Sequence, residues 1–107
     1  MAKDIYIGEV AGNVEIRPDY FLMKVRLPAE FSAALPGQFV MIRIAGLTDP
    51  FLSRPISIYG CSHGRMHGSL ELLYRVAGKG TQILAGLIKG SQVEICGPLG
   101  AGYTINP

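Results

Sequence analysis

Six short segments of this chain are rich in the β-branched and aromatic residues that favour strands, and turns containing glycine or proline separate most of them. The expected strands cover residues 4–16, 20–27, 39–45, 54–59, 69–77 and 91–97. Helical segments do not alternate with these strands, so a parallel sheet built from βαβ units is not expected. The pattern predicts an all-β domain, and a closed antiparallel barrel of six strands with one short helix fits it best.

Local signals refine this expectation. A glycine at position 8 or 12 is expected to bend or bulge the long first strand. Pro55 lies near the start of the fourth strand, which limits it to an edge, a bulge or a first position. The only helical stripe covers residues 81–89, with Thr81 as its N-cap and Gly90 as the left-handed residue after its end. Residues 60–68 are expected to form a hairpin loop.

Composition limits the classes of function. The 107 residues are expected to form one domain over 1–107, with 49% hydrophobic and 17% charged residues. The net charge of +2 is too small to favour capture of nucleic acid or of a membrane surface. No apolar run approaches the roughly 20 residues of a membrane span, and no signal peptide is evident. Cys61 and Cys96 do not make a disulfide framework, which favours a reduced, cytoplasmic setting.

One candidate binding segment is Arg54-Pro55-Ile56-Ser57. A planar guanidinium can bond two oxygens of a diphosphate at once, and Pro55 stiffens the backbone beside it. Ser57 adds a hydroxyl, but it lies one residue off the face that Arg54 shares with Ile56, so a bend is needed for the two to converge. The alternative is that Arg54 is one of many solvated arginines.

A second candidate is Gly78-Lys79-Gly80-Thr81, where a strand ends and a helix is expected to begin. Two glycines let the backbone approach a ligand closely, and a helix start favours an anion. Thr81 is expected to cap the helix or to offer its hydroxyl to a phosphate. The segment is not a P-loop, because Leu73 stands where that motif needs its first glycine. The alternative is an ordinary glycine turn.

These segments occur together with three others in a characteristic order. The further segments are Pro36-Gly37-Gln38-Phe39, Leu73-Tyr74-Arg75 and Gly97-Pro98-Leu99-Gly100. In this order they resemble the flavin-binding domain of the ferredoxin-reductase-like family, and within it the dihydroorotate dehydrogenase electron-transfer branch, from about residue 36 to 103. Isoleucine at position 56, where general members of the superfamily have tyrosine, agrees with that branch.

The resemblance implies a Greek-key barrel that binds FAD. The implied cofactor contacts are Arg54, Pro55, Ile56 and Ser57 at the diphosphate and flavin, Leu73, Tyr74 and Arg75 along the flavin and adenosine, and Gly78, Gly80 and Thr81 at the phosphate. No side chain is expected to act as a catalytic acid, base or nucleophile, because the cofactor carries the redox chemistry.

In the family, electrons pass between a partner's flavin, a [2Fe–2S] centre, FAD and nicotinamide. The NAD-binding domain and the cysteine cluster of the family are expected to be absent from this chain, because it ends at Pro107 and two cysteines cannot hold a cluster. The implied partner is a catalytic dihydroorotate dehydrogenase subunit. A homodimer through a face that a second domain would otherwise cover is a further possibility, which a monomeric mass at high concentration would count against.

Alternatives remain open at this stage. The equivalent subunit of an NADPH-dependent ferredoxin oxidoreductase or of a sulfide dehydrogenase shares the same motifs. A non-enzymatic β-barrel interaction module would need a basic, aromatic face, and aromatic and basic residues rarely interleave here. Cys61, His63 and His67 lie in one expected loop, but three ligands without a fourth are a weak zinc signal, so no metal is expected.

Overall fold

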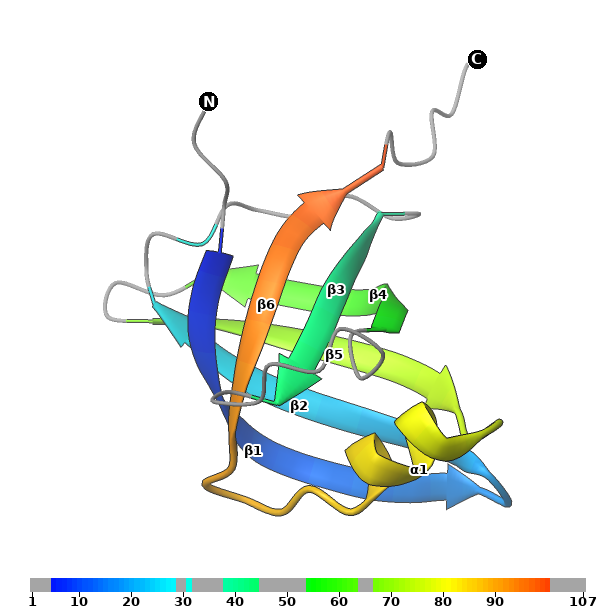
Figure 1. Ribbon diagram of the computed structural model, residues 1–107. Coiled ribbons are helices and arrows are strands. Elements are labelled where there is room, and N and C mark those ends of the chain that lie inside the picture. The colour runs from blue at the N-terminus through cyan, green and yellow to red at the C-terminus, as the bar shows by residue number, and fades with distance from the viewer. Residues whose placement is uncertain (1–4, 29–30, 32–37, 45–53, 64–66, 101–107) are drawn as a thin grey trace.

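The structure is a computed structural model that describes residues 5–28, 31, 38–44, 54–63 and 67–100. Its strands are β1 (Ile5–Arg17), β2 (Tyr20–Pro28), β3 (Phe39–Ile44), β4 (Arg54–His63), β5 (His67–Arg75) and β6 (Gln92–Leu99). They form a closed antiparallel barrel in the order β1-β2-β5-β4-β3-β6 (Figure 1). The expected six-stranded barrel with one short helix is therefore confirmed.

Alternation along the strands builds the core. On β2, Met23, Val25 and Leu27 are buried, and the residues between them face solvent, as the sequence pattern predicts. Leu70 and Leu72 on β5 are buried on the same inner face. The barrel interior is filled with such aliphatic side chains, as expected for a small barrel.

β1 is shared between two halves of the barrel. Residues Ile5–Glu9 pair with β6, and residues Glu9–Arg17 pair with β2. A register shift between Val10 and Gly12 marks the bulge that the glycines predict. The bulge bends the strand at the point where it passes from one partner to the other.

The hairpin between β4 and β5 is longer than the sequence pattern indicates. Residues 60–63 pair with residues 68–71, so most of the loop expected at 60–68 is strand. In this extension Gly60 pairs with Glu71 and Ser62 with Ser69, so apolar alternation does not mark it. Residues 29–30, 32–37, 45–53 and 64–66, which include the expected Pro36-Gly37 turn, lie outside the described residues.

The helix α1 (Lys79–Ala85) begins and ends earlier than predicted. Its N-cap is Gly78, with φ 109°, so the expectation that Thr81 is the N-cap is wrong. Gly78 can adopt this positive φ without a Cβ penalty, which lets the helix start directly after the strand.

The predicted end of the helix is also wrong, because the chain leaves the helix at Gly86. Gly90 has the expected positive φ of 95°, but it lies in a later turn. Ile88, which the periodic pattern placed in the apolar stripe, is 71% exposed. The early end of α1 is caused in part by Asn13, which lies outside the helix and donates hydrogen bonds to carbonyls at the end of the helix and just beyond it.

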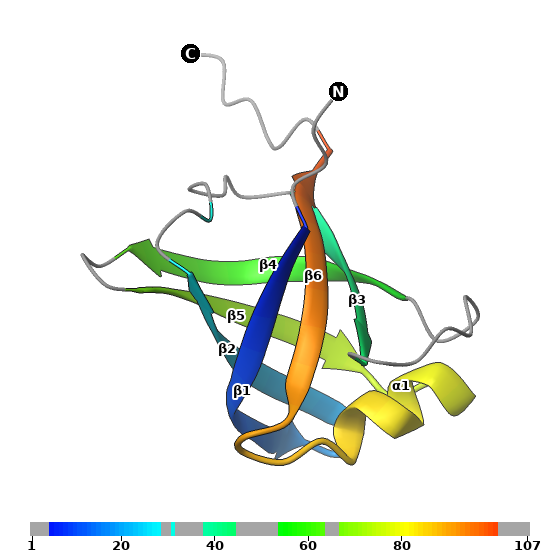
Figure 2. The ribbon, with the colours of Figure 1, turned by 60° about the vertical axis from the view of Figure 1, so that its left-hand side comes forward.

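Two views place α1 at the end of the barrel where β5 finishes and where β1 turns into β2, away from the end where β1 starts and β6 finishes (Figure 1 and Figure 2). None of the helices in the described part of the chain is long and apolar enough to cross a membrane.

Candidate cofactor-binding site

The candidate site lies where β4 and β5 separate. The ladder between them runs from His63 and Gly68 to Ile58 and Leu72. Before Ile58, residues Arg54–Ser57 pair with β3 in the described register, and after Leu72 the end of β5 pairs with β2. The start of β4 and the end of β5 are thus free to diverge, and the turn into α1 follows directly from the end of β5.

Arg54 and Gly80, which are far apart in sequence, meet at this divergence. A Cβ built on Gly80 would lie 2.6 Å from both Cζ and Nη2 of Arg54, so the guanidinium rests against the bare backbone of the helix start. Gly80 is buried and Arg54 is half-buried. The structure therefore brings together the two segments that the sequence singled out.

The turn between β5 and α1 is tied by Thr81. Its Oγ1 accepts a hydrogen bond from the Ala77 backbone N–H at 2.7 Å and donates one to the Gly78 carbonyl at 3.2 Å. The first helical backbone bond runs from the Gln82 N–H to the same carbonyl at 3.0 Å. Because a hydroxyl has one donor, Thr81 stabilises the turn, and its contact with a phosphate stays a prediction.

The other residues of the Arg54 segment face different ways. Arg54 and Ile56 share the inner face of β4, and Ile56 is 6% exposed within the core. Pro55 pairs with Met41 of β3, and Pro55 and Ser57 are exposed. The bulge on β4 lies between Ile58 and Gly60, beyond Ser57, so Ser57 is not turned to the face of Arg54.

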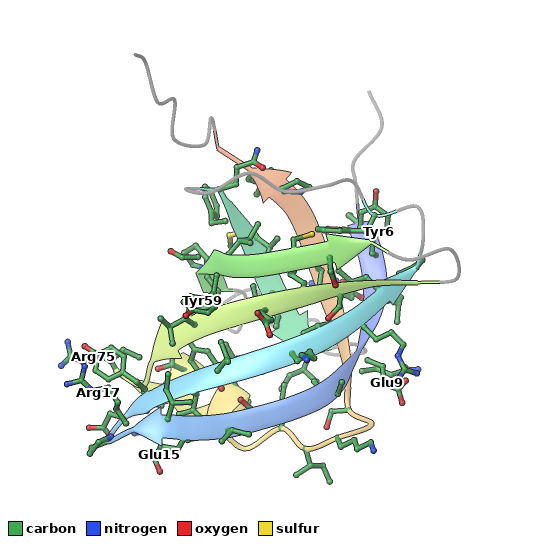
Figure 3. The ribbon with its side chains drawn as sticks, turned by 180° about the vertical axis from the view of Figure 1, so that it is seen from behind. Tyr6, Glu9, Glu15, Arg17, Tyr59 and Arg75 are labelled. Carbon is green, nitrogen blue, oxygen red and sulfur yellow. The ribbon has the colours of Figure 1, made fainter. Side chains whose placement is uncertain are left out.

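The three residues of β5 that were expected to contact FAD also lie on two different faces of the strand. Tyr74 is 5% exposed and points into the barrel, whereas Arg75 is exposed at the end of the strand. Leu73 lies on the outer face with Arg75 and is half-buried. Viewed from behind, Arg75 and Arg17 lie at the same end of the barrel, where Tyr20 pairs with both, and the Arg17 guanidinium is 5.8 Å from the ring centre of Tyr20 (Figure 3).

Tyr74 takes part in a partly buried polar network that the sequence did not reveal. Its hydroxyl donates to Asn13 Oδ1 at 2.8 Å, and burial raises its pKa to about 12. The ring stacks on Phe21 with the two centres 5.8 Å apart.

Asn13 connects this network to the helix. Its Nδ2 donates to the carbonyls of Leu84 at 2.9 Å and Leu87 at 3.0 Å, with a longer contact of 3.4 Å to Ala85. Asn13 thus satisfies carbonyls at the end of α1 and just beyond it from a strand more than seventy residues earlier. Its position directly after the bulge in β1 is the one signal in the sequence that points to it.

The Cys61, His63 and His67 group does not form a described metal site. Within the residues that the structure describes, no cluster of three or more potential metal ligands occurs. Cys61 packs against the core as a free thiol, and the side chains of His63 and His67 lie outside the described part.

The sequence matches the family described as the oxidoreductase FAD-binding domain over residues 8–103. The chain belongs to this family. Its FAD-binding domain is similar to the electron transfer subunit of dihydroorotate dehydrogenase B (NAD(+)) from Desulforamulus reducens, at 41% identity over 101 residues. The corresponding subunit from Fusobacterium nucleatum is 38% identical over 96 residues. These matches cover 94% and 90% of this chain but 38% and 36% of the relatives, so the domain spans less than two fifths of their length.

A solved structure supports the fold. The ferredoxin reductase in carbazole 1,9a-dioxygenase superposes with a TM-score of 0.72, covering 94% of this chain and 30% of that one. Its sequence identity is 23%, so this likeness shows the shared barrel and nothing about substrates.

The residues at the divergence fit the FAD that the family binds. A diphosphate needs fixed donors and a compensating charge, and Arg54 carries a planar guanidinium that lies against Gly80. The helix has only seven residues, so its dipole contributes less than this full charge. When bound, FAD supplies the electron-transfer chemistry, and the domain binds and orients it.

Proposed function

We propose that this FAD-binding domain is the flavin-carrying part of a dihydroorotate dehydrogenase electron-transfer subunit, in which FAD relays electrons between an iron–sulfur centre and NAD. The names of the relatives support this assignment. The observation in this chain that carries it is the contact between Arg54 and Gly80, which places a cation at the turn from β5 into α1.

The contribution of the protein is to position the cofactor. Arg54 offsets one of the two negative charges of the diphosphate, which fixes the middle of the cofactor, between its flavin and adenosine parts, relative to the barrel. Ser57, Leu73 and Arg75 are proposed to contact the rest of FAD from the outer faces of β4 and β5, on which they lie. Tyr74 and Ile56 face the core, so we assign them support of these strands through packing.

The proposed partner is a catalytic dihydroorotate dehydrogenase subunit, because the relatives are described as electron transfer subunits of that enzyme. The proposed compartment is the cytoplasm. The free thiols of Cys61 and Cys96 support a reducing setting.

Titration of the domain with FAD, followed by quenching of flavin fluorescence, tests the proposal. We expect Arg54→Ala to weaken binding about 30-fold, because a hydrogen bond to a charged group contributes about 2 kcal/mol. Arg26→Ala, which removes the same charge from an exposed position on β2, is the matched control. Equal affinities for the two variants would contradict the role of Arg54.

A further inference from the structure

The two glycines of Gly78-Lys79-Gly80 meet different structural requirements. Gly78 has a positive φ of 109°, and a Cβ there would meet nothing within 4 Å. Gly80 is not among the glycines with positive φ, yet a Cβ there would overlap Nε, Cζ and Nη2 of Arg54. Glycine is therefore needed at 78 for backbone conformation and at 80 for space.

The space at Gly80 has a cost in helix stability. Glycine inside a helix is less favourable than alanine, because it loses more backbone freedom. The backbone of Gly80 is helical, so alanine suits its conformation, and the overlap with Arg54 is the steric obstacle that the structure shows. Because the overlapping atoms are the far end of a flexible side chain, an added methyl group would move Arg54 aside and leave the fold intact.

We propose that Gly80 is a positioning residue for the cofactor site, because the absence of a side chain there leaves room for the Arg54 guanidinium at the start of α1. This inference rests on the proposed function of Arg54 as the diphosphate ligand. It assigns Gly80 a role through Arg54, which differs from direct contact between the Gly80 backbone and a phosphate.

The proposal predicts that Gly80→Ala changes the thermal stability of the domain and its affinity for FAD in different ways. In Gly80→Ala the helix gains propensity, so the thermal midpoint is expected to stay level or to rise. The guanidinium loses its fixed position, so FAD binding is expected to weaken about tenfold, a part of the loss expected for Arg54→Ala.

A double-mutant cycle tests whether Gly80 acts through Arg54. FAD affinity and thermal unfolding are measured for the wild type, Arg54→Ala, Gly80→Ala and the double variant. Gly86→Ala is the matched control, because its Cβ would meet only the Ile83 carbonyl at 3.5 Å and the Gln82 carbonyl at 3.9 Å. We expect Gly80→Ala to weaken binding in the wild type and to have no further effect once Arg54 is alanine.

The possible results distinguish the two proposals. A tenfold loss from Gly80→Ala in both backgrounds would overturn the positioning role and would show that Gly80 contacts FAD directly, while the function of Arg54 would stand. Unchanged affinity for Gly80→Ala would also overturn it. Unchanged affinity for Arg54→Ala alone would refute the diphosphate role of Arg54 and, with it, this inference.

Discussion

Replacing Asn13 with alanine removes the link between the barrel and the end of α1. Asn13 Nδ2 donates to the carbonyls of Leu84 and Leu87 at 2.9 and 3.0 Å, and its Oδ1 accepts the hydrogen bond of the buried Tyr74 hydroxyl at 2.8 Å. The substitution therefore leaves two helix-end carbonyls and one buried hydroxyl without these partners.

The expected cost follows from these contacts. The two bonds to carbonyls contribute about 1 kcal/mol each, and a buried hydroxyl left unpaired costs at least about 1 kcal/mol more. The free energy of unfolding of Asn13→Ala is therefore expected to fall by about 3 kcal/mol. For a domain of this size, that corresponds to a drop in the thermal midpoint of about 12 °C.

Urea unfolding followed by circular dichroism measures this change. The control is Gln92→Ala, which removes an exposed amide from β6 and is expected to change stability by less than about 0.5 kcal/mol. Adding Tyr74→Phe to Asn13→Ala removes the unpaired hydroxyl and is expected to restore about 1 kcal/mol. A loss of less than about 0.5 kcal/mol for Asn13→Ala would refute the anchoring role of this network.

Two further predictions concern the barrel. Gly8→Ala is expected to cost about 2 kcal/mol, because its Cβ would lie 2.5 Å from Val25 Cγ1, whereas Gly12→Ala, with nothing within 4 Å, is expected to be tolerated; equal stabilities in urea unfolding would contradict this. The pKa of Tyr74 is raised to about 12, so the stability that this group contributes is present below pH 10 and is lost as the pH rises towards 12. Unfolding at pH 9 and pH 11.5 should therefore show a larger loss for the wild type than for Tyr74→Phe, and parallel losses would rule out the burial effect.

The sequence predicted the barrel well because the signals for its strands lie within short stretches of the chain. Alternation on β2 and β5 reports which side chains face the core, and the glycines of β1 report its bulge. The helix end was mispredicted because Leu87 and Ile88 continue the apolar stripe, while Gly86 and the distant Asn13 end the helix. A hydrogen bond between positions so far apart in the chain leaves no periodic signal.

The sequence predicted which segments form the site, but not how each side chain in them is used. Motif order identified the segments of Arg54 and Gly80, and the structure shows that they touch. Alternation correctly indicated that Ser57 lies off the face of Arg54, and no bulge corrects this in the described register. That Thr81 would use its hydroxyl within the turn could not be deduced, because a capping position and a first-turn position differ only in backbone geometry.

The pairing of β1 with β6 has a consequence for synthesis on the ribosome. Ile5 pairs with Cys96, so β1 waits until nearly the whole domain has been made before that side is covered. Until then the nascent chain presents an unpaired strand edge with Ile5 and Ile7 beside it, the kind of edge that recruits other chains. β6 thus completes the barrel and also covers the strand edge that β1 leaves open until then.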